Sequence, residues 1–267
     1  MNPDDTVAAV RLLVSVANAA DAAAALAGGA DFIDAKDPRT GALGAVSLGV
    51  LQEIRATVGT ARPVTAAIGD ATDEAAIERT AFEFAAAGTA YVKVGFAGVA
   101  SAARVGALTA AARRGVAAGS DGRAALIIAA YADLDASRSV APAVLVDVAA
   151  RAGARGVLLD TADKNGPGLR ALVNAGALAA YVTHAHDSGL LVALAGKLGA
   201  DDLRFVCEAG ADIAGVRGAA CEGGRTGRVS AERVSRMRAL WEDDAARSRA
   251  TGPTAARRSD PPGRSSS

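Results

Sequence analysis

The chain has 267 residues, of which 51% are hydrophobic and 3% aromatic, so it can bury a large core built from Ala, Val, Leu and Ile. Its 29 basic residues balance 29 acidic ones, which excludes the strongly basic surface expected of a nucleic-acid or anionic-membrane binder. Two cysteines make no disulfide framework, and no secretory signal or membrane-spanning apolar run is visible, so we expect a soluble cytoplasmic protein.

Short β-type runs alternate with longer Ala-rich helical stretches along the chain. Most of the runs are nearly continuous in apolar residues, as expected for strands buried on both faces of a parallel sheet. Many of the helical stretches end in Gly, which commonly stops a helix. The eight predicted strands are 11–17, 31–36, 63–68, 90–95, 124–131, 156–160, 190–195 and 212–217.

Eight strand–helix units in alternation predict an α/β fold, a single-domain (β/α)8 TIM barrel over residues 1–246. A doubly wound open sheet is the alternative, but the Gly-rich dinucleotide fingerprint that it would carry after the first strand is missing. From 247 to 267 the chain is mostly Ser, Arg, Pro, Gly and Thr, and we expect a disordered C-terminal tail.

Lysine is scarce, and its positions are informative. The four lysines fall at or just after the carboxyl ends of the second, fourth, sixth and seventh predicted strands. That end of a barrel carries the active site in essentially every known barrel enzyme. Unlike Arg, Lys can lose its proton when desolvated and then act as a nucleophile or base. The candidate residues are Lys36, Lys93, Lys164 and Lys197.

Acidic and phenolic side chains accompany these lysines. Asp34 lies two residues before Lys36 on one strand, so both side chains point to the same face. Asp160 ends the sixth strand, and Tyr131 and Asp133, which we expect to bind the substrate, end the fifth. Lysines and carboxylates in one pocket are suited to imine and proton-transfer chemistry, although each carboxylate could also serve only in a structural salt bridge.

Glycines follow the seventh and eighth strands. Gly196 precedes Lys197 after the seventh strand, and Arg217 and Gly218 end the eighth. Loops at these two places often bind phosphate through backbone N–H groups, and Gly lets the backbone approach the anion. We therefore expect a small phosphorylated substrate here, with tight turns that bind no ligand as the alternative.

Two other motifs carry less weight. His184 and His186 precede the seventh strand, where we expect a helix, and residues two apart on a helix do not share a face. Cys221 lies in a candidate phosphate loop without a His beside it in sequence. We predict no metal site.

Several segments together resemble the (5-formylfuran-3-yl)methyl phosphate synthase family, from about Arg11 to Leu240. They are GGADFIDAKDP at 28–38, GALG at 41–44, YVKVG at 91–95, LDTADKNG at 159–166, ALAG at 193–196 and GVRGAAC at 215–221. The chain departs from the archaeal members in its Ala-rich composition, in Lys197 and in its tail.

The resemblance implies a (β/α)8 lyase that condenses two glyceraldehyde 3-phosphate molecules, releases phosphate and water, and needs no cofactor. It implies Lys36 as the Schiff-base lysine, Lys93 as the proton acceptor, and active-site positions for Asp34, Asp160 and Lys164. A lysine-dependent aldolase acting on another phosphorylated sugar is the alternative, and a non-catalytic phosphate-binding barrel is a third. The sequence leaves open whether the protein forms a homo-oligomer and which pathway uses the furan.

Overall fold

The computed structural model describes the backbone of residues 10–250 and the side chains of residues 10–241. The strands are β1 (Arg11–Val16), β2 (Phe32–Ala35), β3 (Val64–Asp70), β4 (Tyr91–Gly95), β5 (Ala125–Tyr131), β6 (Gly156–Asp160), β7 (Leu191–Leu194), β8 (Ile213–Val216), β9 (Cys221–Glu222) and β10 (Arg228–Val229).

The α-helices are α1 (Ala19–Ala27), α2 (Leu48–Val58), α3 (Glu74–Ala86), α4 (Ala102–Ser120), α5 (Leu134–Ser137), α6 (Pro142–Ala152), α7 (Leu169–Leu172), α8 (Ala175–Asp187), α9 (Leu203–Glu208) and α10 (Ala231–Ala250). Short 3₁₀ turns are η1 (Ala200–Asp202) and η2 (Gly218–Ala220). Helix α10 continues through residue 246 to Ala250, so the start of the predicted tail is helical, and residues 251–267 lie outside the described part.

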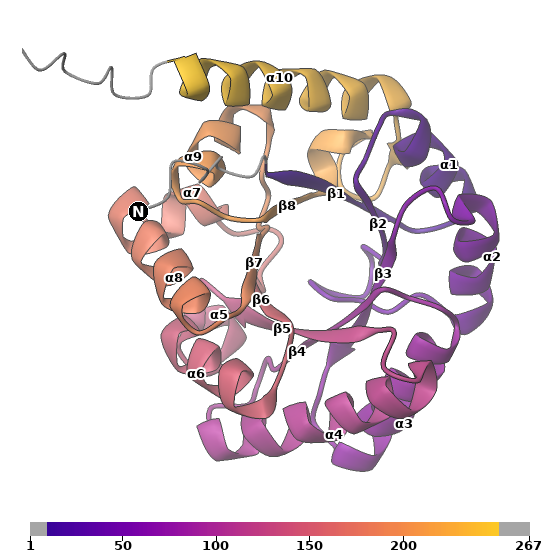
Figure 1. Ribbon diagram of the computed structural model, residues 1–267, viewed down its shortest axis with the longest axis vertical. Helices are drawn as coiled ribbons and strands as arrows, with labels where there is room; N and C mark the ends of the chain where they lie inside the picture. Colours follow the sequence, from indigo (N-terminus) through magenta and orange to yellow (C-terminus); the bar gives the residue numbers. More distant parts are fainter. Residues whose placement is uncertain (1–9, 251–267) are drawn as a thin grey trace, which may run out of the picture.

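The strands β1 to β8 form a closed barrel of parallel strands in chain order, and β1 pairs with β8 to complete the ring. Figure 1 shows the helices outside this ring. The (β/α)8 prediction is therefore confirmed. The eight barrel strands fall within the eight predicted segments, except that β3 extends to Asp70, and the two-residue strands β9 and β10 were not predicted.

Local sequence explains where the outer helices begin. Five helices start after a side chain that accepts a hydrogen bond from the backbone N–H three residues on, which satisfies one of the free donors of the first turn. These capping residues are Asn18, Ser47, Asp73, Ser101 and Asn174.

The barrel interior is closed by apolar side chains at the amino ends of the strands. Leu13, Phe32 and Ile213 form a buried cluster there, with Tyr91 packed against it. The Phe32 and Tyr91 rings lie 6.0 Å apart, and the Arg11 guanidinium lies 5.1 Å from the centre of the Phe32 ring. This cluster shields the barrel interior from water at the amino ends of the strands.

The loop after β2 fills part of the opposite, carboxyl-end mouth. Ala42 and Leu43 enter the barrel and pack against Ala67, Ile127 and Tyr131, while the Gly69 N–H donates to the Leu43 carbonyl at 2.9 Å. The side of the mouth near β3 to β5 is therefore occupied by protein, and the open space lies toward β1, β2 and β6 to β8.

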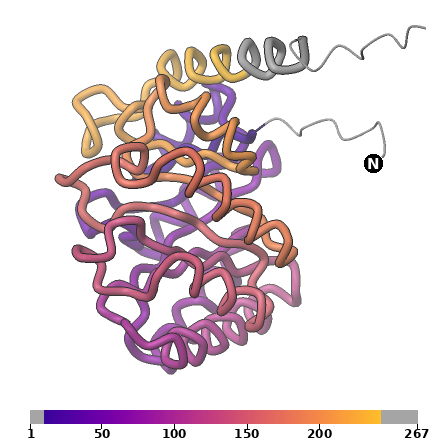
Figure 2. Tube along the Cα trace, turned by 90° about the vertical axis from the view of Figure 1, so that its left-hand side faces the viewer, coloured from indigo at the N-terminus to yellow at the C-terminus, as the bar shows by residue number. Residues whose placement is uncertain are grey.

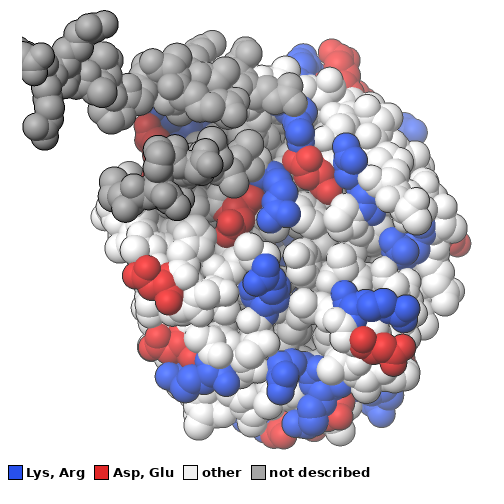
Figure 3. Space-filling view, viewed as in Figure 1, with Lys and Arg blue, Asp and Glu red and all other residues white. Residues whose placement is uncertain are grey.

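Helix α10, the last helix of the barrel, lies beside α1, the first (Figures 1 and 2). A Cβ at Gly28 would come within 2.5 Å of Val234 Cβ, so glycine at the end of α1 permits this close packing. On the face drawn in Figure 3, basic and acidic side chains are interspersed. None of the helices in the described part of the chain is long and apolar enough to cross a membrane.

Candidate active site

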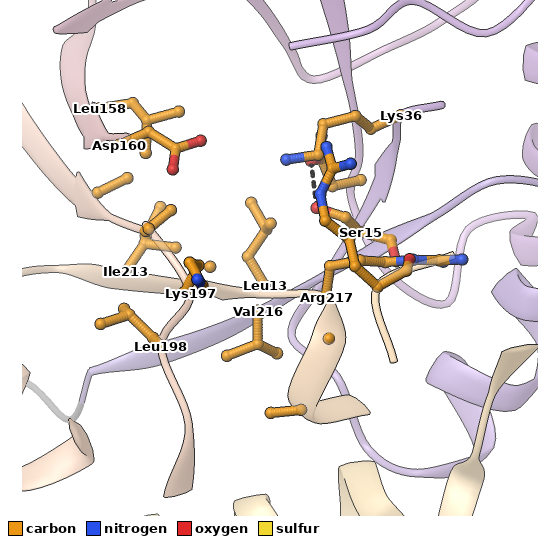
Figure 4. Close-up of a pocket in the computed structure, with 18 of the residues that line it drawn as sticks. Leu13, Ser15, Lys36, Leu158, Asp160, Lys197, Leu198, Ile213, Val216 and Arg217 are labelled. Carbon is orange, nitrogen blue, oxygen red and sulfur yellow. Dashed lines mark hydrogen bonds between the residues drawn. The ribbon is translucent and has the colours of Figure 1, made fainter. Parts of the chain in front are cut away.

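A cavity of about 350 Å³ opens at the carboxyl ends of the strands. Figure 4 shows Lys36 and Asp160 on opposite sides of it with their charged ends turned toward its interior. Its charged and hydroxyl lining residues are Ser15, Asp34, Lys36, Lys93, Asp160, Lys164, Lys197, Arg217 and Arg225. The structure thus brings all five expected catalytic side chains to one pocket.

The Asp34 carboxylate is fixed by three donors. The strand register places Ser15 and Thr65 beside Asp34 on β1 and β3. The Ser15 and Thr65 hydroxyls donate to it at 3.0 and 2.7 Å, and Lys93 Nζ lies 2.5 Å from Oδ1. Burial alone would raise the pKa of Asp34, but the charges of Lys93 and Lys36 outweigh burial and hold that pKa below its usual value. Asp34 is therefore a fixed anion that orients Lys93.

Asp160 forms the second acidic position. Its Oδ1 accepts a hydrogen bond from Lys164 Nζ at 2.6 Å and from the Thr161 N–H at 2.8 Å. Its Oδ2 is buried and has no hydrogen-bond partner in the structure. Burial favours the neutral acid, but Lys164 and Lys36 lower the pKa of Asp160 below its usual value. The free oxygen is available to a ligand in the pocket.

Lys36 differs from its two neighbours in having no partner. Lys93 pairs with Asp34 and Lys164 pairs with Asp160, whereas no ion pair joins Lys36 to another of the described residues. Burial lowers the pKa of Lys36 to about 8, and the charges of Lys164 and Lys93 act in the same direction against the opposing carboxylates. A substantial fraction of Lys36 is therefore neutral near pH 7 to 8.

The loop after β7 contributes Gly196 and Lys197 to the pocket wall. Gly196 has φ +103°, a backbone conformation that favours glycine, and Lys197 has φ +59°. Lys197 Nζ donates to the Gly166 carbonyl at 2.6 Å, so this exposed lysine ties the β6 and β7 loops together.

Arg217 lines the pocket, but its guanidinium is engaged with the protein. It donates to Asp21 at 2.7 Å and to the carbonyls of Ser15, Arg225 and Gly227 at 2.8 to 3.0 Å. Arg217 thus lies at the pocket as predicted, with its guanidinium bound to the protein itself. Arg217 holds the β9–β10 loop against β1 and α1.

Ser15, Thr65 and Arg225 also lie at this site, although none of them is among the site residues predicted from the sequence. Ser and Thr in strands carry no signal by themselves, because only the register shows that they flank Asp34. Arg225 lies in a loop that is brought to the pocket by the β9–β10 hairpin.

The structure places two expected substrate ligands outside the pocket. Tyr131 is fully buried beneath the β2 loop, and its hydroxyl donates to Asp70 at 2.6 Å. Burial, aided by Asp70, raises the pKa of Tyr131 well above its usual value. Asp133 accepts hydrogen bonds from the Ala162 and Asp163 N–H groups at 2.7 and 2.8 Å. It therefore shapes the turn that leads to Lys164.

The remaining motifs stand apart from the pocket. His184 and His186 lie on α8 and contact different carboxylates, Asp147 and Asp212, each at 3.0 Å. Cys221 is buried, which raises the pKa of its thiol. Across the described residues, no group of three or more His, Cys, Asp or Glu side chains is arranged to hold a metal ion.

Solved structures share this barrel. The crystal structure of KGPDC from Streptococcus mutans superposes with a TM-score of 0.58 at 15% identity, over 90% of this chain and 98% of that one. The crystal structure of a 3-hexulose-6-phosphate synthase gives a TM-score of 0.56 at 20% identity, over 86% of this chain and 99% of that one. At these identities the likeness shows the fold alone.

Sequence relatives are closer. The (5-formylfuran-3-yl)methyl phosphate synthase of Methanopyrus kandleri is 39% identical over 80% of this chain and 90% of its own length, and that of Methanocaldococcus jannaschii is 36% identical over 86% and 98%. A Streptomyces griseus protein that carries this synthase name provisionally is 40% identical over 84% and 90%. The family model for 4-HFC-P synthase matches residues 12–238. The chain therefore belongs to the 4-HFC-P synthase family.

Proposed function

We propose that this protein condenses two molecules of glyceraldehyde 3-phosphate into (5-formylfuran-3-yl)methyl phosphate through an imine on Lys36. The observation that carries the proposal is the state of Lys36. Of the lysines that line the pocket, Lys93 and Lys164 pair with carboxylates and Lys197 donates to a backbone carbonyl. Lys36 has no such partner among the described residues, and burial lowers its pKa to about 8. An amine must be neutral to attack an aldehyde, so this lysine is the best nucleophile of the set.

The first steps follow from the side chains around Lys36. Neutral Lys36 adds to the aldehyde of one triose, and the carbinolamine loses water to give a protonated imine. Asp160, with one oxygen free, can accept and return the proton that moves in this dehydration. The imine withdraws electrons and acidifies the adjacent C–H bond.

We assign the removal of that proton to Lys93, as the family resemblance implies. Asp34 is held ionised with its Oδ1 2.5 Å from Lys93 Nζ, so it orients this lysine at the pocket wall and stabilises its charged form. The resulting enamine supplies the carbon nucleophile that joins the two trioses. Elimination of one phosphate, ring closure and dehydration complete the furan. The balance is two glyceraldehyde 3-phosphates to one furan phosphate, one inorganic phosphate and two waters.

These steps need no metal or organic cofactor, because the imine itself serves as the electron sink. The reaction class is a carbon–oxygen lyase acting on a phosphate. The substrate is a small phosphorylated molecule, and a cytoplasmic location suits a lysine site that acts on a triose phosphate.

The direct test is incubation with glyceraldehyde 3-phosphate. We expect inorganic phosphate and a near-ultraviolet absorbance of the conjugated furan aldehyde to appear together in a one-to-one ratio. A lysine-dependent aldolase would consume the triose without either signal. Loss of substrate without phosphate release would reject the synthase and favour that alternative.

The rate should depend on pH through Lys36. Below about pH 8 Lys36 is protonated, so kcat/KM should fall about tenfold per pH unit on the acid side and level off above that value. The phosphate of the substrate titrates near pH 6, so the range from 6.5 to 9.5 isolates the enzyme group. A kcat/KM that still rises about tenfold per pH unit up to pH 9.5, as an ordinary lysine with a pKa of 10.5 would give, would contradict the assignment.

A side chain at Gly218, in the loop after β8, should leave the fold intact but weaken substrate binding. A Cβ at Gly218 would meet only Arg225 atoms at 3.8 to 3.9 Å, which is ordinary contact. Gly218→Val should therefore fold normally but raise KM about tenfold or more, because the side chain occupies the space that the phosphate needs to reach the backbone.

The matched control is Gly106→Ala, at a position in α4 where a Cβ has no neighbour within 4 Å. Gly218→Val should keep the wild-type thermal midpoint, and Gly106→Ala should keep or slightly raise it, because Ala favours a helix interior over Gly. An unchanged KM in Gly218→Val would refute phosphate binding at this loop.

A further inference from the structure

Arg225 is a cation at the pocket wall without a counter-ion. It lies in the loop between β9 and β10 and lines the cavity, partly buried. No salt bridge in the described part of the chain includes it. Its neighbour Arg217, by contrast, is neutralised by Asp21 at 2.7 Å. The charge of Arg225 is thus left for something that enters the pocket.

Backbone carbonyls hold the guanidinium in place. Nη1 donates to the Pro38 carbonyl and Nη2 donates to the Gly41 carbonyl at 2.7 Å, both in the loop after β2. The Arg225 carbonyl itself accepts a hydrogen bond from Arg217 Nε at 3.0 Å. A carbonyl oxygen orients a guanidinium without cancelling its charge, and these two contacts use two of its five N–H donors. The group is therefore positioned in advance and still has donors to offer.

The surroundings favour an anion at this point. Burial lowers the pKa of Arg225, and the charge of Arg217 acts in the same direction, while the carboxylates of Asp160 and Asp37 oppose the lowering without offsetting it. An anion bound against the guanidinium would relieve this cost. Gly218 lies beside the backbone of Arg225, where an added Cβ would be 3.8 Å from the Arg225 nitrogen.

We propose that Arg225 is a phosphate-binding residue that defines an anion subsite on the β8 side of the pocket, separate from the Gly196–Lys197 loop. The ligand class is a phosphate monoester or inorganic phosphate, which the guanidinium binds through charge-assisted hydrogen bonds. Its identity as the phosphate of one of two trioses rests on the proposed function. Two phosphate dianions repel each other, so a reaction between two triose phosphates requires two such places in one cavity.

The test is a calorimetric titration of the full chain with inorganic phosphate at pH 7.5 and constant ionic strength. We expect Arg225→Gln to bind phosphate about 10- to 100-fold more weakly than wild type, as for the loss of a hydrogen bond to a charged group. Arg225→Lys keeps a point charge but loses the planar fork, and should fall between them. Arg39→Gln, an exposed arginine of the β2 loop outside the pocket, should match wild type.

Binding of phosphate to Arg225→Gln within twofold of wild type would overturn the proposal. If that variant does not fold, modification of the wild-type protein with phenylglyoxal decides instead. We expect phosphate, but not chloride at equal ionic strength, to protect Arg225 and leave Arg39 labelled, and equal labelling of Arg225 with and without phosphate would reject the subsite. Both measurements are independent of turnover. A protein that binds phosphate at Arg225 but makes no furan would refute the proposed reaction and leave the subsite standing.

Discussion

Replacing Lys36 by Arg is expected to reduce turnover by about 10⁴-fold or more while leaving the fold intact. Arginine keeps the positive charge that Asp160 and Asp34 experience, but it cannot become neutral at any working pH. The nucleophile is lost and the electrostatic balance of the pocket is retained. Steady-state kinetics and the thermal midpoint measure the two effects separately.

Borohydride trapping locates the imine itself. Reduction in the presence of glyceraldehyde 3-phosphate should add the mass of one reduced triose phosphate to the peptide that contains Lys36, and nothing to the Lys36→Arg protein. Lys93→Arg and Lys164→Arg should still be labelled at Lys36, because their charges are conserved. An adduct on Lys93 or Lys164 in the wild type would show that nucleophile and base are assigned wrongly.

Replacing Arg217 by Met is expected to lower the free energy of unfolding by about 3–5 kcal/mol. The Arg217–Asp21 pair is almost fully buried, with side chains 6% and 3% exposed. Loss of the guanidinium leaves the Asp21 carboxylate uncompensated, although it still accepts hydrogen bonds from the Ala17 and Val229 N–H groups. Urea unfolding followed by circular dichroism gives the value.

A double variant and a surface control test whether the loss of stability comes from the unpaired buried charge. Arg217→Met combined with Asp21→Leu removes both charges and should recover much of the loss. Arg236→Met breaks an exposed pair with Glu232, whose atoms are 3.7 Å apart, and should cost less than about 1 kcal/mol. A loss under 1 kcal/mol in Arg217→Met would mean that the buried pair does not hold the β9–β10 loop to β1.

The barrel and its lysines could be predicted because their signals are local. Apolar runs of strand length recur along the chain. Three of the four lysines follow the last residue of a strand as predicted, whereas Lys93 lies within β4. The two-residue spacing of Asp34 and Lys36 fixed their common direction, and both side chains line the pocket. None of this required knowledge of which strands are neighbours.

The remaining features depend on contacts between distant parts of the chain. Arg217 points at Asp21, 196 residues away in sequence, and nothing near either residue indicates that pairing. Tyr131 ends its strand as expected, but the loop after β2 covers it and separates it from the pocket. Arg225 reaches the β2 loop across a similar separation, so its place at the pocket could only come from the folded structure.

The pairing of β1 with β8 bears on how the protein is made. Strand β1 leaves the ribosome before the other strands of the barrel, yet its second neighbour begins at Ile213. At about 5–20 residues per second, β1 waits on the order of ten seconds or more with one edge unpaired. An apolar strand with a free edge is a template for association with other chains. Soluble yield in cells should therefore respond to chaperone supply and to growth temperature more strongly than the stability of the finished barrel would suggest.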